Sequence, residues 1–355
     1  MAIVRKRRFV FTSIALSLGL AAALLVGPSR GDSDDGLLDS AKKSFQALPK
    51  ESKAEGNPAQ ADLVELGRKL FFDPRISVDG TGSCVRCHQP ALYGTDGLAG
   101  SIALHDKVLP RNAPTVLNSG LQFRIHWDGV FASVEEQAGK ALLGPGFLNA
   151  DNSVVVARVK AIPGYPELFR KAFPKEDDPV TVERFASAIG AFERTLNTRS
   201  RFDEYLDGKA DALTAIERTG LRRFIETGCS DCHDGVGIGG SAYQKFGVFD
   251  DYWKATGSAE VDKGRSNVTK DDNDLYTFKV PSLRNVAMTA PFFHDGSVND
   301  LPKAVKVMAS VQLGKTLSDQ EVAEMVAFLE SLTGPLPANF ANAPILPAAG
   351  FRPQP

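Results

Sequence analysis

The sequence predicts a mostly α-helical protein built from two similar units that carry long ordered loops. Apolar residues recur at helical spacing in several segments, and no run of alternating apolar and polar residues indicates a sheet. A five-residue pattern, C-x-x-C-H, occurs at residues 84–88 and again at 229–233, each time after a predicted helix. One copy of the motif in each half of the chain indicates two units rather than one.

Size and composition place the chain among ordinary globular proteins. Its 355 residues are enough for two domains, and 43% of them are hydrophobic. The net charge is −2 and no basic stretch stands out, which argues against a nucleic-acid partner.

The first 30 residues have the layout of an export segment. Basic residues 5–8 precede an apolar run at 9–26, which a Gly-Pro pair ends. A cleaved signal peptide and an uncleaved N-terminal anchor both fit, because the cleavage motif is weak and the apolar run is about long enough to span a bilayer. Both place the rest of the chain outside the cytoplasm. Residues 31–60 are polar and are predicted to form a flexible linker.

The C-x-x-C-H motifs use all four cysteines of the chain, which are Cys84, Cys87, Cys229 and Cys232. This pattern is the attachment signature of c-type haem. The two thiols add to the vinyl groups of the porphyrin, and the next residue, His88 or His233, becomes the proximal ligand of the iron. A redox dithiol, half of a zinc site or a disulfide loop would fit one C-x-x-C alone. Two copies that each end in histidine favour two covalently bound haems.

Helices are predicted around each motif, and long loops follow it. The predicted helices cover residues 62–72, 133–142, 183–196, 214–227, 300–310 and 318–332. Thr214 with Glu217, and Ser318 with Glu321, form capping-box patterns at two of the helix starts. The segments 89–118 and 234–276 are rich in glycine, proline or acidic residues and are predicted to be loops.

The order of these elements predicts the domains. Residues 61–205 are expected to form an N-terminal haem domain, and residues 206–340 a C-terminal one, both similar to cytochrome c. Residues 341–355 are a tail rich in proline and alanine that is expected to wrap the surface.

Several further stretches carry a resemblance to a known family. They are LGRKLFFDPRIS (66–77), RNAPTVLN (111–118), HWDG (126–129), EEQA (135–138), FKVPSLRNVAMTAPFFHDGSV (278–298) and LGKTLSDQEVAEMVAFLESLTG (313–334). With the two haem motifs, they make the chain similar to the bacterial di-haem cytochrome c peroxidases. The wider superfamily includes the di-haem enzymes that mature methylamine dehydrogenase. The resemblance implies reduction of hydrogen peroxide to water, with electrons from a small mono-haem cytochrome c or a cupredoxin.

The resemblance implies different roles for the two haems. The haem on the first motif would be the peroxidatic one, and the haem on the second would receive electrons. Met308 matches the second axial ligand of the C-terminal haem, where the methylamine-dehydrogenase-maturing enzymes carry tyrosine instead. From the residues alone, Met288 and Met325 compete for this role, and Met308 could simply pack in the core.

Two more residues match family positions near the haems. Trp127 matches a tryptophan between the two haems, where its ring would assist electron transfer, and the alternative is a tryptophan of the core. His105 is the candidate distal ligand that in the family blocks the peroxidatic iron until the other haem is reduced. It lies one residue from the usual position and lacks the preceding glycine, so an exposed loop histidine is the alternative.

A calcium site between the domains is also implied. Asn112 would supply a side-chain oxygen, and Thr289 and Pro291 would supply backbone carbonyls, which suits a hard cation that keeps several waters. The alternative is a turn of asparagine and proline without an ion.

The sequence departs from the family at the catalytic carboxylate. Peroxide cleavage needs a group that moves a proton near the open face of the iron. The family carries a glutamate soon after the EEQA glutamine, but here Gln137 is followed by no carboxylate until Asp151. Asp151 is therefore the candidate substitute. Asp128, Glu135 and Glu136 are further candidates, although their positions are more typical of surface or capping charges.

The sequence thus predicts a periplasmic di-haem peroxidase, because c-type haems are attached outside the cytoplasm. The missing glutamate leaves two other functions open. One is a di-haem enzyme that oxidises residues of a partner protein, and the other is a di-haem electron-transfer protein without catalysis. Members of the family are commonly homodimers, but no stretch of this sequence marks an interface.

Overall fold

The computed structural model describes residues 34–49, 61–144 and 151–348, so the predicted export segment lies outside the described residues. Within these ranges no helix is both long and apolar enough to cross a membrane. The chain is largely helical with little sheet. Its elements are α1 (Asp34–Ser44), α2 (Ala61–Phe72), α3 (Val134–Leu143), α4 (Asn152–Ala161), α5 (Tyr165–Ala172), α6 (Val182–Glu193), α7 (Arg201–Leu206), α8 (Ala215–Thr227), β1 (Tyr243–Lys245), α9 (Tyr252–Thr256), α10 (Ser266–Thr269), β2 (Thr277–Lys279), α11 (Leu301–Leu313), α12 (Asp319–Glu330) and α13 (Ala338–Ala341).

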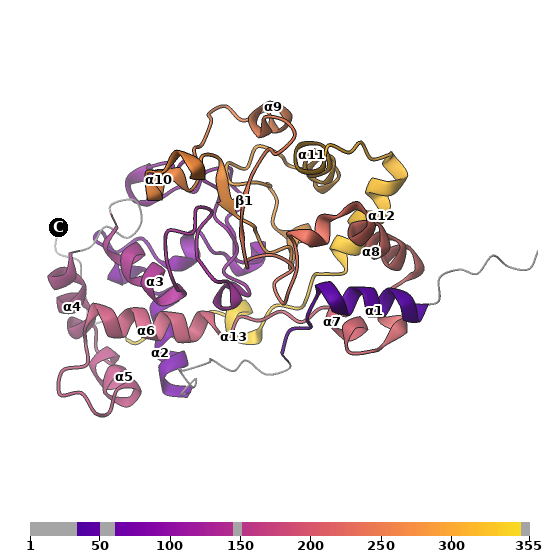
Figure 1. The fold of residues 1–355 in the computed structure, drawn as a ribbon. Coiled ribbons are helices and arrows are strands. Elements are labelled where there is room, and N and C mark those ends of the chain that lie inside the picture. Colours follow the sequence, from indigo (N-terminus) through magenta and orange to yellow (C-terminus); the bar gives the residue numbers. More distant parts are fainter. Residues whose placement is uncertain (1–33, 50–60, 145–150, 349–355) are drawn as a thin grey trace, which may run out of the picture.

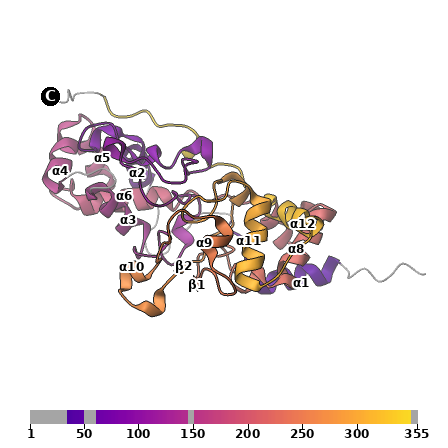
Figure 2. The same ribbon diagram turned by 90° about the horizontal axis from the view of Figure 1, so that it is seen from above.

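The helices gather into two groups, each around its own hydrophobic core. Helices α2 to α6 surround one core, and α8 and α12 with α7 surround the other. Figures 1 and 2 show the two groups at opposite ends of the molecule, with β1 and α9 between them and α10 beside the first group, near α3. We refer to the group of helices α2 to α6 as the N-terminal unit and to the group of α7, α8 and α12 as the C-terminal unit.

Each unit is centred on two helices that cross at a glycine. In the N-terminal unit α2 crosses α6, and a Cβ atom added at Gly67 would lie 1.8 Å from the carbonyl oxygen of Ala188. In the C-terminal unit α8 crosses α12, and a Cβ atom at Gly220 would lie 1.9 Å from the carbonyl oxygen of Glu324. No other residue would allow such close backbone contact, so the same packing device is used twice.

The capping boxes predicted from sequence form as expected. The Thr214 side chain accepts from the Glu217 backbone while the Glu217 carboxylate accepts from the Thr214 N–H, and Ser318 with Glu321 makes the same pair. Both satisfy backbone groups that a helix start would otherwise leave unpaired. They fix where α8 and α12 begin, and α8 leads directly into the second C-x-x-C-H motif.

Each end of the described chain packs on the unit that is distant from it in sequence. Helix α1 buries Leu37, Ala41 and Phe45 in the core of the C-terminal unit. The prediction of a flexible linker is therefore wrong for residues 34–49, because an apolar stripe at helical spacing lies among the charged residues that suggested it. Residues 50–60 of that segment lie outside the described residues.

The opposite end of the chain packs on the N-terminal unit. Phe340 of α13 is fully buried in the N-terminal core. The tail then runs across α2, where Arg68 donates to the carbonyls of Asn339 and Asn342, and Lys69 donates to that of Ile345. The predicted domain boundary at residue 205 falls inside α7, which packs in the C-terminal core.

A buried ion pair fastens α7 to the rest of the C-terminal unit. The guanidinium of Arg284 donates to both carboxylate oxygens of Asp203 at 2.9 and 3.0 Å, and both side chains are completely buried. The Asp203 carboxylate also accepts from the backbone N–H of Leu48, just after α1. Such a pair is stable only when its remaining polar atoms are satisfied, and the carbonyls of Val236 and Gln46 accept the other Arg284 donors.

A two-stranded sheet lies where the units meet. Strands β1 and β2 are antiparallel, with Gln244 opposite Phe278. Each strand has only three residues, too few for the alternation by which a strand is predicted from sequence.

Candidate functional site

The two C-x-x-C-H segments have the same local backbone. Each is a 3-10 turn that begins at its first cysteine, Cys84 or Cys229. In both, the N–H of the histidine, His88 or His233, donates to the carbonyl of that cysteine at 3.0 Å. This backbone hydrogen bond fixes the backbone of each histidine relative to the first cysteine of its own motif. The repetition predicted from sequence is therefore also a repetition of geometry.

The first motif opens into a large cavity, which we call the N-terminal cavity. Its volume is about 1160 Å³. Helices α3 and α6 form one wall, and the loop before α10 together with residues 294–297 closes it from the C-terminal unit. Charged and polar residues on its walls include Arg86, Asn112, Arg111, Gln137, Asp128, Glu193 and Asp262.

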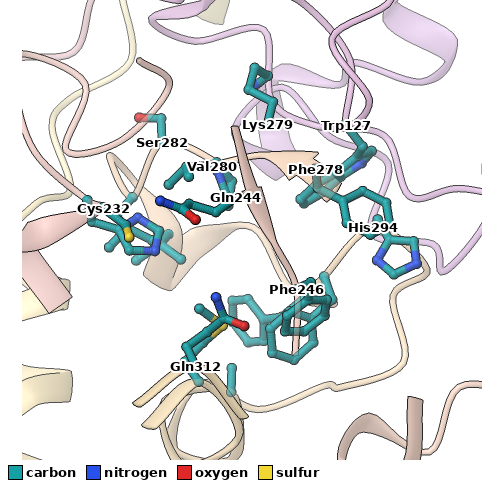
Figure 3. A pocket seen from close by; sticks show the side chains of 18 of the residues that line it. Trp127, Cys232, Gln244, Phe246, Phe278, Lys279, Val280, Ser282, His294 and Gln312 are labelled. Atoms are coloured by element: carbon teal, nitrogen blue, oxygen red, sulfur yellow. The ribbon is translucent and has the colours of Figure 1, made fainter. Parts of the chain in front are cut away.

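The second motif opens into a smaller and more apolar cavity, which we call the C-terminal cavity. Its volume is about 250 Å³. Figure 3 shows Cys232 on one side of it and the rings of Phe246, Phe278 and His294 on the other.

Two methionines line the C-terminal cavity. Met308 on α11 and Met325 on α12 both do so, whereas Met288 is 46% exposed and lies outside it. The structure therefore argues against Met288 as a ligand, and it places Met308 on the same cavity as His233.

His233 is buried and His88 is partly buried, and their surroundings disfavour the charged form of both imidazoles. Burial lowers the pKa of His88, and it lowers the pKa of His233 to about 4. His88 Nδ1 lies 3.0 Å from the carbonyl oxygen of Gly94, which leaves Nε2 for another partner. His233 Nδ1 is buried without a hydrogen-bond partner among the described residues. A neutral imidazole with one nitrogen available is the form that binds a metal.

These residues fit a covalently attached haem better than the alternatives. All four cysteines are free thiols, so neither motif is a disulfide loop. Within the described ranges no three His, Cys, Asp or Glu side chains converge as a zinc site would require. Two thiols and an available imidazole at the edge of an apolar cavity are the donor set that a c-type haem uses.

Trp127 lies between the two cavities and lines both. Its Nε1 donates to the carbonyl of Asn112 at 2.9 Å, and its own carbonyl accepts from the N–H of Lys279 at 2.7 Å. The indole is thus held by the N-terminal unit, and the backbone of Trp127 is held by the C-terminal unit. Its nearest aromatic neighbour from the C-terminal unit is His294, at 6.5 Å between ring centres.

The three residues predicted to bind calcium, Asn112, Thr289 and Pro291, all line the C-terminal cavity. The amide nitrogen of Asn112 donates to the carbonyl oxygen of Leu98 at 2.9 Å and to that of Pro291 at 3.2 Å. Two carbonyl oxygens, one from each unit, therefore converge on the Asn112 side chain.

His105 is not brought to the N-terminal cavity. It is exposed, at the tip of a hairpin in which Ala103 N–H donates to the Lys107 carbonyl. Its backbone is left-handed, with φ of 56°. Arg86, inside the first motif, donates to the carbonyl of Ile102 at 2.8 Å and fixes the hairpin beside the motif.

Of the residues predicted to handle protons, Gln137 lines the N-terminal cavity and Asp151 does not. Asp151 is exposed and caps α4, with its carboxylate accepting from the N–H and the hydroxyl of Ser153. Nearness in sequence to the family position did not bring this carboxylate to the cavity, because Asp151 begins a new helix that points it to solvent.

Sequence reasoning missed two charged residues on the cavity walls. Glu193 is 5% exposed, and burial together with the charge of Glu135 raises its pKa to about 8. Lys279 is 6% exposed beside the amide oxygen of Gln122, and burial lowers its pKa to about 8. The sequence signal for both was a single charge at the end of an apolar run, which is weak on its own.

Arg111 joins the two units across the mouth of the N-terminal cavity. Its guanidinium donates to Asp128 at 2.5 Å and to Asp262 of the C-terminal unit at 2.7 Å. Burial opposes ionisation of Asp262, but the Arg111 charge outweighs it and lowers the pKa of that carboxyl. This bridge holds the segment before α10 against the N-terminal unit.

Comparisons with known proteins agree with this geometry. The family description "Di-haem cytochrome c peroxidase" matches residues 61–211. The chain is 41% identical to the cytochrome c551 peroxidase of Pseudomonas aeruginosa, over 89% of this chain and 91% of that protein. It is 42% identical to the cytochrome c551 peroxidase of Nitrosomonas europaea, over 82% and 85% respectively. Among solved structures, a MauG-like protein associated with microbial copper homeostasis is similar, with a TM-score of 0.70 and 29% identity over 81% of this chain and 94% of that one.

Proposed function

The chain belongs to the di-haem cytochrome c peroxidase family and is an oxidoreductase with peroxide as acceptor, and we propose that its two cavities have different roles in this reaction. The observation that carries the proposal is that Trp127 lines both cavities while each cavity contains one C-x-x-C-H motif. When bound through these motifs, two haems supply the redox-active irons that the reaction needs.

The N-terminal cavity is the proposed site of peroxide reduction. It has the larger volume, and Gln137 from α3 offers an amide to a small polar molecule there. His105 lies outside this cavity, so the side chain expected to block the iron is withdrawn in this conformation. His88 is the proposed proximal ligand, oriented by its contact with the Gly94 carbonyl.

The C-terminal cavity is the proposed electron-receiving site. His233 and Met308 face a common space there, and we assign them as the two axial ligands. Thioether ligation raises the reduction potential of a haem, which suits a site that accepts electrons from a donor protein. A methionine at this position favours the peroxidase over the enzymes that mature methylamine dehydrogenase.

Two further assignments follow the family. Asn112, Thr289 and Pro291 are proposed to hold one Ca²⁺ where the units meet, since all three line the C-terminal cavity, the Asn112 side chain contacts the Pro291 carbonyl, and hard cations prefer oxygen ligands. The haems are proposed to be covalent, and attachment outside the cytoplasm makes the periplasm the proposed location, with residues 1–30 as the export segment. The proposed donor is a small mono-haem cytochrome c or a cupredoxin.

The experiment is peroxide turnover by the holoenzyme with a reduced mono-haem cytochrome c, in wild type and in Trp127→Phe. Loss of the indole is expected to slow turnover about tenfold, which corresponds to about 1.4 kcal/mol in the barrier. Trp253→Phe is the matched control, because that residue lines neither cavity. Wild-type turnover no faster than that of free haem would overturn the proposed function.

A further inference from the structure

Glu193 occupies an unusual place for a carboxylate. It lies on the last turn of α6, and its side chain reaches the wall of the N-terminal cavity on which Gln137 also lies. Gln137 comes from α3, which packs along α6. The carboxyl group of Glu193 and the amide of Gln137 therefore line one wall of the space proposed for peroxide.

The other carboxylates on this cavity are already engaged or exposed. Within the described residues they are Asp128, Glu260, Asp262 and Asp295. Arg111 pairs with Asp128 and Asp262, and Ser297 donates to Asp295 at 2.7 Å, while Glu260 is exposed. Among the described residues, Glu193 is the one carboxyl on these walls that is both buried and without a basic partner at ion-pair distance.

The surroundings of Glu193 keep it protonated near neutral pH. The charged and titratable groups that act on it are Glu135 from α3, Arg194 directly after α6 and the Cys84 thiol, and the Ser119 hydroxyl also contacts it. Arg194 is engaged by Glu135 at 2.8 Å, so its charge only partly offsets that of Glu135 at Glu193. Burial and the Glu135 charge thus hold the pKa of Glu193 at about 8.

We propose that the carboxyl group of Glu193 supplies a proton to peroxide in the N-terminal cavity, a role that rests on the proposed peroxidase function. One peroxide takes two electrons from the reduced donor protein and two protons, and it leaves as two waters. As the O–O bond breaks, Glu193 gives its proton to the departing oxygen and then regains one from solvent. The glutamate that the family carries after its EEQA segment is thereby replaced by a carboxyl from a different helix.

The first test compares Glu193→Gln with wild type in donor-driven peroxide turnover over a range of pH. An acid of this kind contributes about 10²-fold or more, so the variant should lose on the order of 10² in kcat. Wild-type kcat should decline above a pH of about 8, where Glu193 loses its proton, and the variant should lack this decline. Glu183→Gln, on the exposed first turn of the same helix, is the matched control and should keep the wild-type rate and profile.

The second test reads the carboxyl directly and does not depend on turnover. The infrared spectrum of the wild-type holoenzyme should show a protonated-carboxyl band that disappears as the pH rises through about 8 and that is absent in Glu193→Gln. Glu135→Gln should shift the disappearance of this band to lower pH, because the variant removes the neighbouring negative charge and releases Arg194.

The outcomes separate the two proposals. A wild-type enzyme without turnover would overturn the proposed function, whatever the infrared spectrum shows. An active wild type whose Glu193→Gln variant keeps the same rate and the same alkaline decline would overturn the role of Glu193 alone. If Glu193→Gln does not fold, an infrared band in wild type that fails to shift in Glu135→Gln would have the same consequence.

Discussion

The two C-x-x-C-H cavities begin from the same backbone and end with different surroundings. Both motifs are 3-10 turns with the same histidine-to-cysteine hydrogen bond, and each unit crosses its main helices at a glycine. The N-terminal cavity is larger and is lined by Glu193, Gln137 and Arg111, whereas the C-terminal cavity is smaller and is lined by Met308 and aromatic rings. The difference teaches that one motif can stand in two different surroundings, and that helices far from it in sequence decide which side chains each cavity offers.

Removing the attachment thiols should have the largest effect. Cys84→Ser with Cys87→Ser should lower the haem content from two per chain to one and abolish peroxide turnover. Cys229→Ser with Cys232→Ser should also leave one haem, but should abolish electron transfer from the donor protein. The measurement is the haem content of the purified protein together with its absorption spectrum. Two haems in either double variant would contradict the assignment of the motifs.

Substitution of the glycine at each helix crossing should show whether both units depend equally on close packing of their two main helices. Gly67→Ala and Gly220→Ala each place a Cβ within 2 Å of a carbonyl oxygen, so each should destabilise its own unit by about 3 kcal/mol. Denaturant unfolding followed at each haem would measure both.

A third glycine gives the matched control. Gly36 of α1 has no atom within 4 Å of an added Cβ, so Gly36→Ala should be neutral or stabilising. Equal stability of Gly67→Ala and wild type would show that the close approach at the crossing is not required.

Substitution of Met308 should change the reduction potential of one haem and leave that of the other unchanged. Met308→His should lower the reduction potential of the C-terminal haem by on the order of 0.1 V, since axial ligands span roughly 0.8 V across haem proteins. The N-terminal haem should be unchanged. Spectroelectrochemical titration measures both potentials, with Met288→Leu as the control because Met288 is exposed and outside the cavity. A C-terminal potential that does not move would remove Met308 as the ligand.

The smallest expected effect concerns the bridge between the units. Arg111→Gln removes a partly exposed guanidinium from Asp128 and Asp262, which should cost about 1 kcal/mol. Thermal unfolding should broaden toward two transitions, because the segment before α10 would be held less firmly to the N-terminal unit. A single transition at the wild-type temperature would show that Arg111 does not couple the units.

Local features were predictable from the sequence, and contacts between distant segments were not. Thr214 and Ser318 were identified correctly as helix N-caps, because the pattern of a capping box lies within four consecutive residues. Gln137 lines the N-terminal cavity, as the family resemblance implied. Asp151 does not line it, whereas Glu193 does. The raised pKa of Glu193 depends on its burial and on the charge of Glu135, and the packing of α3 against α6 that places them together is not visible in one segment alone.

The packing of each chain end on the distant unit has a consequence for how the protein is made and for how it can be divided. Phe340 completes the core of the N-terminal unit, and Leu37 helps to complete that of the C-terminal unit. During synthesis the N-terminal unit cannot close its core until α13 has been made. A chain cut between the two units would leave each fragment without one of its own walls, so expressing either half as a separate single-haem protein requires grafting α13 or α1 onto it.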